Sequence, residues 1–409
     1  MDFDMLGLQP RLVAKLAEMK ITDPTPIQAQ AIPHAMNGRD VLGLAQTGTG
    51  KTAAFGLPLV HMMTGVGAKP APKTARGLVL APTRELAKQI ADNLMAFCEG
   101  SHLRVALVVG GVSLNPQIRR MERGVDLLVA TPGRLIDLLD RNAVRLNETR
   151  FLVLDEADQM LDLGFIHALR RIAPLLPAER QTMLFSATMP KQMAELAAAY
   201  LTDPVRVAVS PPGKAADKID QSVHFVQKGD KPDLLISLMD KHRGDRALVF
   251  VRTKHGADRL AKQIEKSGFP VAAIHGNRSQ GQRDRAIDGF RKGTIKVLVA
   301  TDVAARGIDI PDVRHVYNFD LPNVPDNYVH RIGRTARAGN DGAAIAFCAP
   351  DEMGELRDIQ KVMKADIPVA GGRPWEGALP AKKTQGRGGR PGGGKPGGGH
   401  GGGMAKPGA

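Results

Sequence analysis

Short apolar runs alternate with longer amphipathic stretches along most of the chain. Runs such as "RGLVLAPT" (76–83) and "RFLVLDEAD" (150–158) are rich in Val and Leu, which favours buried strands. The stretch "RELAKQIADNLMAF" (84–97) instead has the spacing of an amphipathic helix. Strands that are apolar on both faces and separated by helices are typical of βαβ units around a parallel sheet. Further runs of this kind are "RVALVVGG", "DLLVATPG" and "TMLFSAT".

The alternation pauses at "SPPGKAADKID" (210–220) and then begins again. A helix is predicted at "GADRLAKQIEKSG" (256–268), because its apolar residues fall on one face. We therefore predict two α/β domains, 1–209 and 221–369, joined by a linker over 210–220. The strands of the second domain are predicted at "QSVHFVQ", "RALVFVRT", "PVAAIHG", "IKVLVATDV" and "VRHVYNF".

The chain changes character after residue 370. The segment 370–409 contains "GRGGRPGGGKPGGGHGGG", which is basic, Gly-rich and nearly free of large apolar residues. Such a composition cannot bury enough surface to offset the entropy of ordering, so we predict a disordered tail. Its charges favour a mobile polycation that concentrates RNA near the folded domains, with a merely solubilising tail as the alternative.

Charge points to an anionic partner. The 409 residues carry a net charge of +14, of which seven Lys or Arg and one Glu in 371–409 supply +6. The remaining excess of cations lies in the predicted domains and favours nucleic acid as a ligand. Only two cysteines occur, Cys98 and Cys348, and no signal peptide or membrane span is evident, so a cytoplasmic protein is expected.

The stretch "AQTGTGKT" (45–52) follows a strand-like "DVLGL" and precedes a helical run. It fits the phosphate loop G-x-x-x-x-G-K-[ST], except that alanine replaces the first glycine. Backbone N–H groups of 48–52 would surround phosphate oxygens, Lys51 would reach the β- and γ-phosphates, and Thr52 would contribute a hydroxyl to Mg²⁺. The residues of this loop are Ala45, Gln46, Thr47, Gly48, Thr49, Gly50, Lys51 and Thr52.

Acidic residues at the end of another predicted strand complete a nucleotide site. In "FLVLDEAD" four apolar residues precede Asp155, Glu156 and Asp158. Asp155 at the strand tip can hold Mg²⁺ through water, and Glu156 can polarise the attacking water. Together with the phosphate loop, these residues predict an ATP-hydrolysing site that uses ATP and Mg²⁺.

The string "DEAD" (155–158) gives the DEAD-box RNA helicases their name, and the sequence resembles that family over residues 3–365. The other family motifs follow in order, which identifies the chain as a member, similar to the bacterial RhlE-type subgroup because of its "HGN.SQ" and basic tail. The family resemblance implies two tandem RecA-like domains with parallel sheets flanked by helices. The motifs are "PTPIQ", "PTRELA", "GG", "TPGR", "SAT", "LVFVRT", "HGNRSQGQR", "ATDVAARGID" and "HRIGRTARAG".

The resemblance also implies roles for individual residues. Gln28 would recognise adenine, Phe3 would stack at the upstream aromatic position, and Asp309 would reach toward the ribose. Arg334 and Arg337 would act as arginine fingers at the γ-phosphate, beside the catalytic Lys51 and Glu156. Residues implied in coupling the two domains are Ser186, Thr188, His330 and Arg331.

RNA contacts in the family fall on the phosphate backbone. Only 4% of residues are aromatic, which independently argues against a base-stacking surface and for low sequence specificity. For any single arginine, a solvated charge or a salt bridge remains an alternative. The implied RNA contacts are Arg84, Gly111, Thr131, Arg134, Arg252, Gly276, Gln280, Arg283 and Thr301.

Two positions depart from the family pattern. Lys20 and Ile21 replace the usual glycine and aromatic residue before the glutamine motif, which predicts weaker adenine stacking. Ala336 stands where the family usually has glycine in "GRTGR", and an alanine is expected to keep helical backbone angles rather than positive φ.

The expected activity is non-processive, ATP-dependent unwinding of short RNA duplexes or remodelling of RNA–protein complexes, by a monomer with RNA-stimulated ATP hydrolysis. The main alternative is an ATP-gated RNA clamp or annealer. A DNA helicase and a non-hydrolysing relative are further alternatives, disfavoured by the "DEAD" and glutamine motifs and by the intact set of catalytic residues. Protein partners from ribosome assembly or RNA decay are compatible with this activity.

Overall fold

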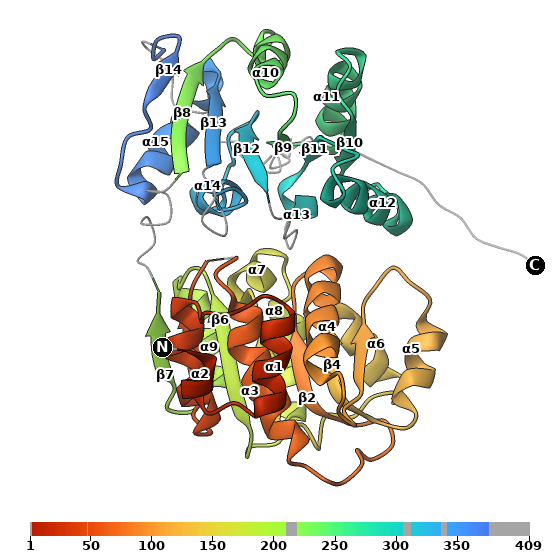
Figure 1. The fold of residues 1–409 in the computed structure, drawn as a ribbon. Helices are drawn as coiled ribbons and strands as arrows, with labels where there is room; N and C mark the ends of the chain where they lie inside the picture. The colour runs from red at the N-terminus through yellow and green to blue at the C-terminus, as the bar shows by residue number, and fades with distance from the viewer. Residues whose placement is uncertain (1, 47, 210–218, 306–311, 337–341, 376–409) are drawn as a thin grey trace, which may run out of the picture.

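The computed structural model describes residues 2–46, 48–209, 219–305, 312–336 and 342–375. Two parallel α/β sheets of seven strands each organise this chain (Figure 1). The first sheet has the strand order β3-β4-β2-β5-β6-β1-β7 and the second has the order β10-β11-β9-β12-β13-β8-β14. The predicted fold class is therefore confirmed. We call the part built on each sheet the first and the second domain.

The strands of the first sheet are the apolar runs of the first half of the sequence. Their bounds are β1 (Val41–Leu44), β2 (Ala75–Leu80), β3 (Val105–Val108), β4 (Val125–Ala130), β5 (Phe151–Leu154), β6 (Gln181–Ser186) and β7 (Val205–Ala208). The helices of this domain are η1 (Phe3–Leu6), α1 (Pro10–Glu18), α2 (Pro26–Met36), α3 (Lys51–Thr64), α4 (Arg84–Cys98), α5 (Leu114–Met121), α6 (Pro132–Asp140), α7 (Ala157–Asp162), α8 (Ile166–Ile172), η2 (Ala173–Leu175) and α9 (Lys191–Tyr200).

The second domain repeats the arrangement with a different set of crossovers. Its strands are β8 (Ile219–Phe225), β9 (Arg246–Phe250), β10 (Val271–Ile274), β11 (Val297–Ala300), β12 (Val313–Asn318), β13 (Gly342–Cys348) and β14 (Val369–Gly371). Its helices are α10 (Lys231–Asp240), α11 (Lys254–Lys266), α12 (Gln280–Arg291), α13 (Asp302–Ala305), α14 (Pro325–Ile332), η4 (Pro350–Glu352) and α15 (Met353–Met363).

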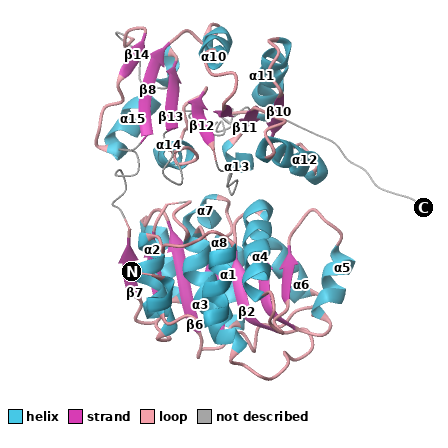
Figure 2. Ribbon diagram, viewed as in Figure 1, coloured by secondary structure: helices cyan, strands magenta, loops and turns pink. Residues whose placement is uncertain are grey.

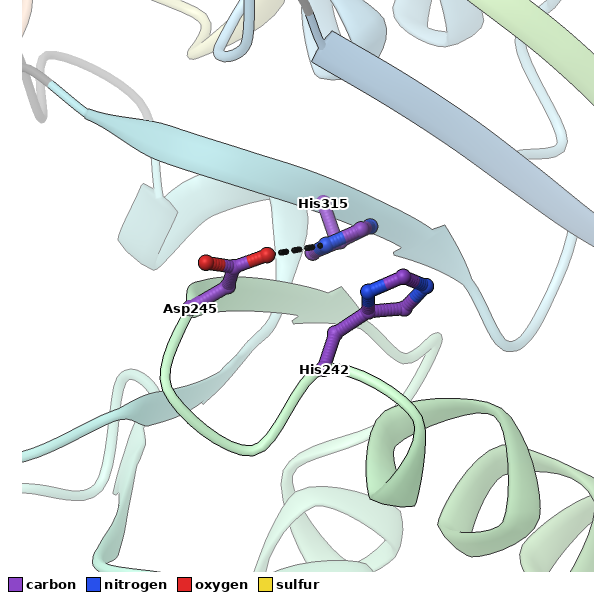
Figure 3. Close-up of side chains that lie close together, drawn as sticks. All are labelled: His242, Asp245 and His315. Carbon is purple, nitrogen blue, oxygen red and sulfur yellow. Dashed lines mark hydrogen bonds and ion pairs between the residues drawn. The ribbon is translucent and has the colours of Figure 1, made fainter.

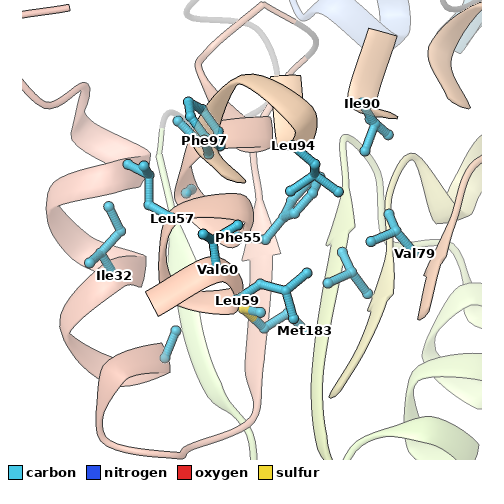
Figure 4. Packing of buried hydrophobic residues seen from close by; sticks show 14 of the residues in the cluster. Ile32, Phe55, Leu57, Leu59, Val60, Val79, Ile90, Leu94, Phe97 and Met183 are labelled. Carbon is cyan, nitrogen blue, oxygen red and sulfur yellow. The ribbon is translucent and has the colours of Figure 1, made fainter. Parts of the chain in front are cut away.

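Helices cover both faces of each sheet, as Figure 2 shows, which explains why the strands are apolar on both sides. Along β2, Leu78 and Leu80 pack in one hydrophobic cluster while Val79 between them packs in another. Figure 4 shows the cluster that contains Val79, in which Val79 packs with Phe55 of α3 and Leu94 of α4. Alternate side chains of each strand thus anchor different helix layers.

The described chain extends past the predicted domain end at residue 369. β14 reaches Gly371, and Nε1 of Trp375 donates a hydrogen bond to the backbone oxygen of Cys348 at 3.1 Å. Part of the segment 370–375, which composition assigns to the tail, thus contacts the second sheet, because β14 pairs with β8 and the indole ring of Trp375 has apolar surface to pack. The rest of the predicted tail, 376–409, and most of the predicted linker, 210–218, lie outside the described residues.

Within the described residues, no helix is both long enough and apolar enough to cross a bilayer.

Candidate active site

The predicted phosphate loop connects β1 to α3. Gly48 and Gly50 have φ angles of 83° and 91°, which L side chains rarely adopt, and Gly50 is the residue before α3. The first turn of α3 begins at Lys51, so its N–H groups, which lack helical acceptors, border the loop. This arrangement is suited to an anionic phosphate. Thr47 lies outside the described residues.

Gln28 connects α2 to this loop. Its Oε1 accepts a hydrogen bond from the backbone N–H of Thr25 at 2.9 Å, and its Nε2 donates to the backbone oxygen of Gly50 at 3.0 Å. A side chain at position 50 would bring a Cβ within 2.4 Å of that Nε2. The amide predicted to recognise adenine is therefore oriented by the loop that would hold the phosphates.

Phe3 has surroundings that differ from those expected of a stacking residue. It lies in η1, its side chain is 2% exposed, and it packs in the same hydrophobic cluster as Leu6 and Leu8. The contacts of this ring in the structure are thus those of a core residue. Lys20 stands where the family usually has glycine upstream of the motif. Its φ of 58° shows that the backbone there has the left-handed conformation that favours glycine.

Lys51 and Asp155 form a buried pair of opposite charge. The Nζ of Lys51 lies 3.2 Å from the backbone oxygen of Ala45 and 3.9 Å from Oδ1 of Asp155. Burial raises the pKa of Asp155 to about 6, and the ammonium of Lys51 opposes this shift. Because this carboxylate has lost its hydration, a second cation nearby would further stabilise its charged form.

Glu156 begins the turn from β5 into α7. Its φ of 52° is left-handed, and its side chain is buried. A left-handed residue other than glycine costs on the order of 1 kcal/mol, so its retention at a strand end next to Asp155 is typical of a functional site. The backbone N–H of Glu156 donates to Oδ1 of Asp155 at 3.0 Å, which orients the carboxylate of Asp155 at the start of this turn.

Asp158, the last letter of "DEAD", gathers more contacts than the sequence indicated. Its Oδ2 accepts hydrogen bonds from the N–H groups of Ala187 and Thr188 at 3.1 and 2.9 Å, and from Oγ1 of Thr188 at 3.0 Å. Ser186 donates its hydroxyl to the backbone oxygen of Thr188 at 2.7 Å. Asp158 therefore ties the predicted coupling loop to α7, just after the acidic end of β5. The sequence did not indicate this role, because it depends on which loops lie side by side in the fold.

The second domain contributes His330 and Arg331 from the end of α14. Nε2 of His330 lies 4.0 Å from Oδ2 of Asp158, so His330 reaches the first domain. The guanidinium of Arg331 instead pairs with Asp302 and lies over the ring of Phe250, its carbon 5.0 Å from the ring centroid. Within the described chain, the hydrogen bonds and ion pairs recorded for Arg331 all join groups of its own domain.

Arg334 lies two residues after the end of α14 and is 4% exposed. It lines a small cavity with His330 and Asp302. Arg337 and Asp309, the other residues predicted to act from the second domain on the nucleotide, lie outside the described residues. Ala336 does not keep helical angles as expected but has a φ of 53°, so the chain adopts the glycine-like turn despite the methyl group.

Four of the predicted RNA contacts lie where the two domains approach each other. Nη1 of Arg84 lies 3.0 Å from Oε1 of Gln280, and Arg283 pairs with Glu85 at 3.0 Å. Gly111 packs so closely that a Cβ there would lie 1.6 Å from Nη1 of Arg84. A cleft of about 770 Å³ runs beside these residues, between α4, α5 and α12.

The remaining predicted RNA contacts are more dispersed. Arg134 donates to the backbone oxygen of Val112 at 3.1 Å, which places it beside the glycine pair. Arg252 pairs with Glu352 at 3.3 Å, a partner in its own domain. Thr131, Gly276 and Thr301 follow the ends of β4, β10 and β11. Glu85, which pairs with Arg283, was not predicted as a site residue.

Two family models cover most of the described chain. The model of the DEAD/DEAH box helicase matches residues 25–196, and that of the helicase conserved C-terminal domain matches residues 230–339. The chain is 42% identical over 362 residues to the DEAD-box ATP-dependent RNA helicase CshA of Bacillus cereus, covering 88% of this chain and 68% of that protein. It is 41% identical to the ATP-dependent RNA helicase CshA of Listeria monocytogenes, covering 92% and 72%.

Solved structures agree. Dbp5 of S. cerevisiae bound to RNA and ADP BeF3 superimposes with a TM-score of 0.80 at 34% identity, over 90% of this chain and 95% of that one. A DEAD box protein from Methanococcus jannaschii superimposes with a TM-score of 0.54 at 36% identity, over 90% and 99%. With its phosphate loop, its buried acidic strand end and these relatives, the chain belongs to the DEAD-box ATP-dependent RNA helicases.

Proposed function

We propose that the protein separates short RNA duplexes non-processively, or remodels RNA–protein complexes, by closing its two domains over ATP and RNA together. The observation that carries the proposal is the contact of His330 with Asp158, because it joins the second domain to the start of α7, directly after the acidic end of β5. RNA bound across both domains would favour the same closed arrangement, so that its binding promotes hydrolysis.

Similarity to solved structures supports a closed arrangement of the two domains. At similar sequence identities, the TM-score is higher for Dbp5 bound to RNA and ADP BeF3 than for the M. jannaschii protein, 0.80 against 0.54. Mss116p bound to ssRNA and AMP-PNP also gives a high value, 0.81 at 28% identity. The relative placement of the domains here thus resembles that of relatives holding RNA and a nucleotide.

The buried acidic strand end fits a magnesium ion. A desolvated carboxylate and a hydroxyl are oxygen donors of the kind that Mg²⁺ prefers, and Asp155 and Thr52 supply them. When bound, the ion would neutralise phosphate charge. Lys51 would hold the phosphates in place, and Glu156 would orient the attacking water and polarise it.

Arg334 and Arg337 are proposed to neutralise the charge that develops on the γ-phosphate, while Gln28 selects adenine. Asp309 is proposed to contact the ribose. His330 would couple closure to this chemistry, together with Ser186 and Thr188.

The RNA strand is proposed to lie along the predicted backbone contacts. Arg84, Gln280 and Arg283 are supported by their meeting across the domains, and Gly111 by its close packing on Arg84. Arg134 lies beside the glycine pair. The other proposed contacts are Thr131, Arg252, Gly276 and Thr301.

A strand-displacement assay tests the function. The full chain should separate a short RNA duplex only when ATP is present, and Glu156→Gln should bind ATP but lose both displacement and turnover. An ATP-dependent increase in RNA affinity without displacement would instead indicate an RNA clamp or annealer. Equal stimulation of ATP hydrolysis by DNA of the same length would contradict RNA as the substrate.

We also propose a subgroup for the chain, a role for its basic segment and the ends of its domains. The RhlE-type resemblance rests on "HGN.SQ" and the basic segment 376–409, whereas the relatives reported above carry the name CshA. The basic segment is proposed to raise the affinity for RNA, and domain ends near 209 and 375 are proposed from the two sheets. Protein partners from ribosome assembly or RNA decay, and a monomeric state, complete the proposal.

A further inference from the structure

Three side chains with metal-binding groups converge in the second domain, apart from the residues assigned to ATP and RNA. His242 follows α10, Asp245 lies just before β9, and His315 lies on β12 (Figure 3). One ligand atom from each lies within 4.8 Å of the other two. The cluster lies at the beginning of β9, whereas the motif residue Arg252 follows its end. It is therefore separate from the nucleotide and RNA residues.

The backbone fixes two of these residues in a tight turn. The N–H of Asp245 donates to the backbone oxygen of His242 at 2.9 Å, which closes a four-residue turn. The N–H of His242 in turn donates to Met239 at 3.0 Å, and Nζ of Lys296 donates to the backbone oxygen of Gly244 at 2.9 Å. His242 and Asp245 are thus held in relation to each other before any ligand binds.

His315 is brought to the turn by an irregularity of the sheet. β12 pairs with β9 through Val313 opposite Arg246 and His315 opposite Ala247, so the register shifts between them. Such a bulge changes the direction of the following side chain. Nε2 of His315 consequently lies 2.9 Å from Oδ2 of Asp245, and its ring stacks on that of His242 with centroids 4.6 Å apart.

The two neighbouring arginines, Arg243 and Arg246, form their ion pairs with carboxylates other than that of Asp245. Arg243 pairs with Asp240 and lies over the ring of Phe269, and Arg246 pairs with Asp312. Among the ion pairs of the described residues, Asp245 has only His315 as a partner. The side chains of Asp245 and His315 are 42% and 13% exposed, so solvent reaches the cluster on one side while protein encloses the other.

We propose that His242, Asp245 and His315 bind a zinc-like divalent transition metal ion. Two imidazoles and one carboxylate are a common ligand set for Zn²⁺, and a water molecule would complete a tetrahedral site. The three residues line a cavity of about 10 Å³, which is enough for one small ion or water. The ligand atoms already lie within 4.8 Å of one another, so small side-chain rotations are enough to reach the spacing that a bound ion requires.

The ion would join the turn before β9 to β12. Because a ligand that binds only the folded protein stabilises it, Zn²⁺ should raise the unfolding temperature of the second domain. The cluster contains none of the residues assigned to ATP or RNA, so RNA-stimulated ATP hydrolysis should not require the ion.

Cobalt binding to the full chain tests the site. After treatment with a chelator, the protein is titrated with Co²⁺ and the visible d–d absorption is recorded, followed by displacement with Zn²⁺. We expect a single equivalent with the strong absorption of a tetrahedral ion. His242→Ala and Asp245→Asn should weaken binding more than about tenfold, since loss of even an outer-shell partner commonly costs 10–100-fold.

His255→Ala is the matched control, because His255 is exposed on α11 and lies outside the cluster. It should bind Co²⁺ as the unchanged protein does, and all variants should keep RNA-stimulated ATP hydrolysis in Mg²⁺ buffer, which shows that they fold. Absence of a stoichiometric equivalent in the unchanged protein would overturn the proposal. Equal binding by all three variants and the unchanged protein would do the same.

Discussion

Asp158 and His330 connect the two domains, with Nε2 of His330 4.0 Å from Oδ2 of Asp158. The same oxygen accepts hydrogen bonds from the N–H groups of Ala187 and Thr188, in the loop after β6. A displacement of α14 therefore changes the environment of an atom that also positions this loop. Through this relation, the second domain would affect the part of the proposed nucleotide site that the first domain supplies.

His330→Ala should uncouple RNA binding from ATP hydrolysis. Coupling energies between sites commonly correspond to 5–150-fold changes, so we expect RNA stimulation of the ATPase to fall by at least about tenfold. Basal ATP binding should be retained, because His330 does not belong to the phosphate loop. Steady-state ATPase with and without RNA measures this, and unchanged stimulation would contradict the role of the contact.

Gly111→Ala should weaken RNA binding by displacing Arg84. The added Cβ would lie 1.6 Å from Nη1 of Arg84, and the φ of 71° adds backbone strain of about 1 kcal/mol. Gly110→Ala is the control, because its Cβ would lie 3.8 Å from the same guanidinium in ordinary contact. RNA affinity measured by fluorescence anisotropy should fall for the first variant alone; a similar loss in both would implicate the loop backbone instead.

Asp155 should make stability depend on pH. Folding raises its pKa from 3.8 to about 6, so its stabilising contribution is complete below pH 4 and is lost as the pH rises through 6. Asp155→Asn lacks this dependence. The free energy of unfolding of the variant should therefore increase relative to the unchanged protein by about 2–3 kcal/mol between pH 4 and 7.

Denaturant unfolding at several pH values, without nucleotide, measures this difference. A constant gap between the two proteins across the range would show that the carboxyl group titrates in the folded protein as it does in the unfolded chain.

Ala336→Gly should stabilise the protein. The φ of 53° at Ala336 is costly for an alanine and readily adopted by glycine, and the gain is reduced by the greater freedom of glycine in the unfolded chain. We expect a net gain of about 0.5–1 kcal/mol in the free energy of unfolding. Ala261→Gly on α11, in a helix interior, is the control and should cost a similar amount.

The fold could be predicted from the sequence because the strands are apolar on both faces and follow one another at regular intervals. The phosphate loop and "DEAD" could be placed on the same sheet for the same reason. The sequence did not indicate the burial of Phe3, since packing of η1 depends on α1 and α2 rather than on its own residues.

Long-range contacts account for the other differences. Ala336 has positive φ where the chain packs closely on Gly342 of β13: a Cβ at Gly342 would lie 2.1 Å from Oγ1 of Thr335 and 2.6 Å from the backbone nitrogen of Ala336. The cluster of His242, Asp245 and His315 joins residues about seventy positions apart through a β-bulge that no local pattern predicts. The partner of Asp158 depends on which loops become neighbours.

The ion pair of Arg283 with Glu85 has a consequence for the thermodynamics of RNA binding. A phosphate that engages Arg283 must displace a carboxylate of the protein, not only a counterion from solution. The release of counterions sets the slope of affinity against salt concentration. That slope should therefore be smaller than the number of arginine–phosphate contacts implies, and Glu85→Gln should steepen it while strengthening the binding.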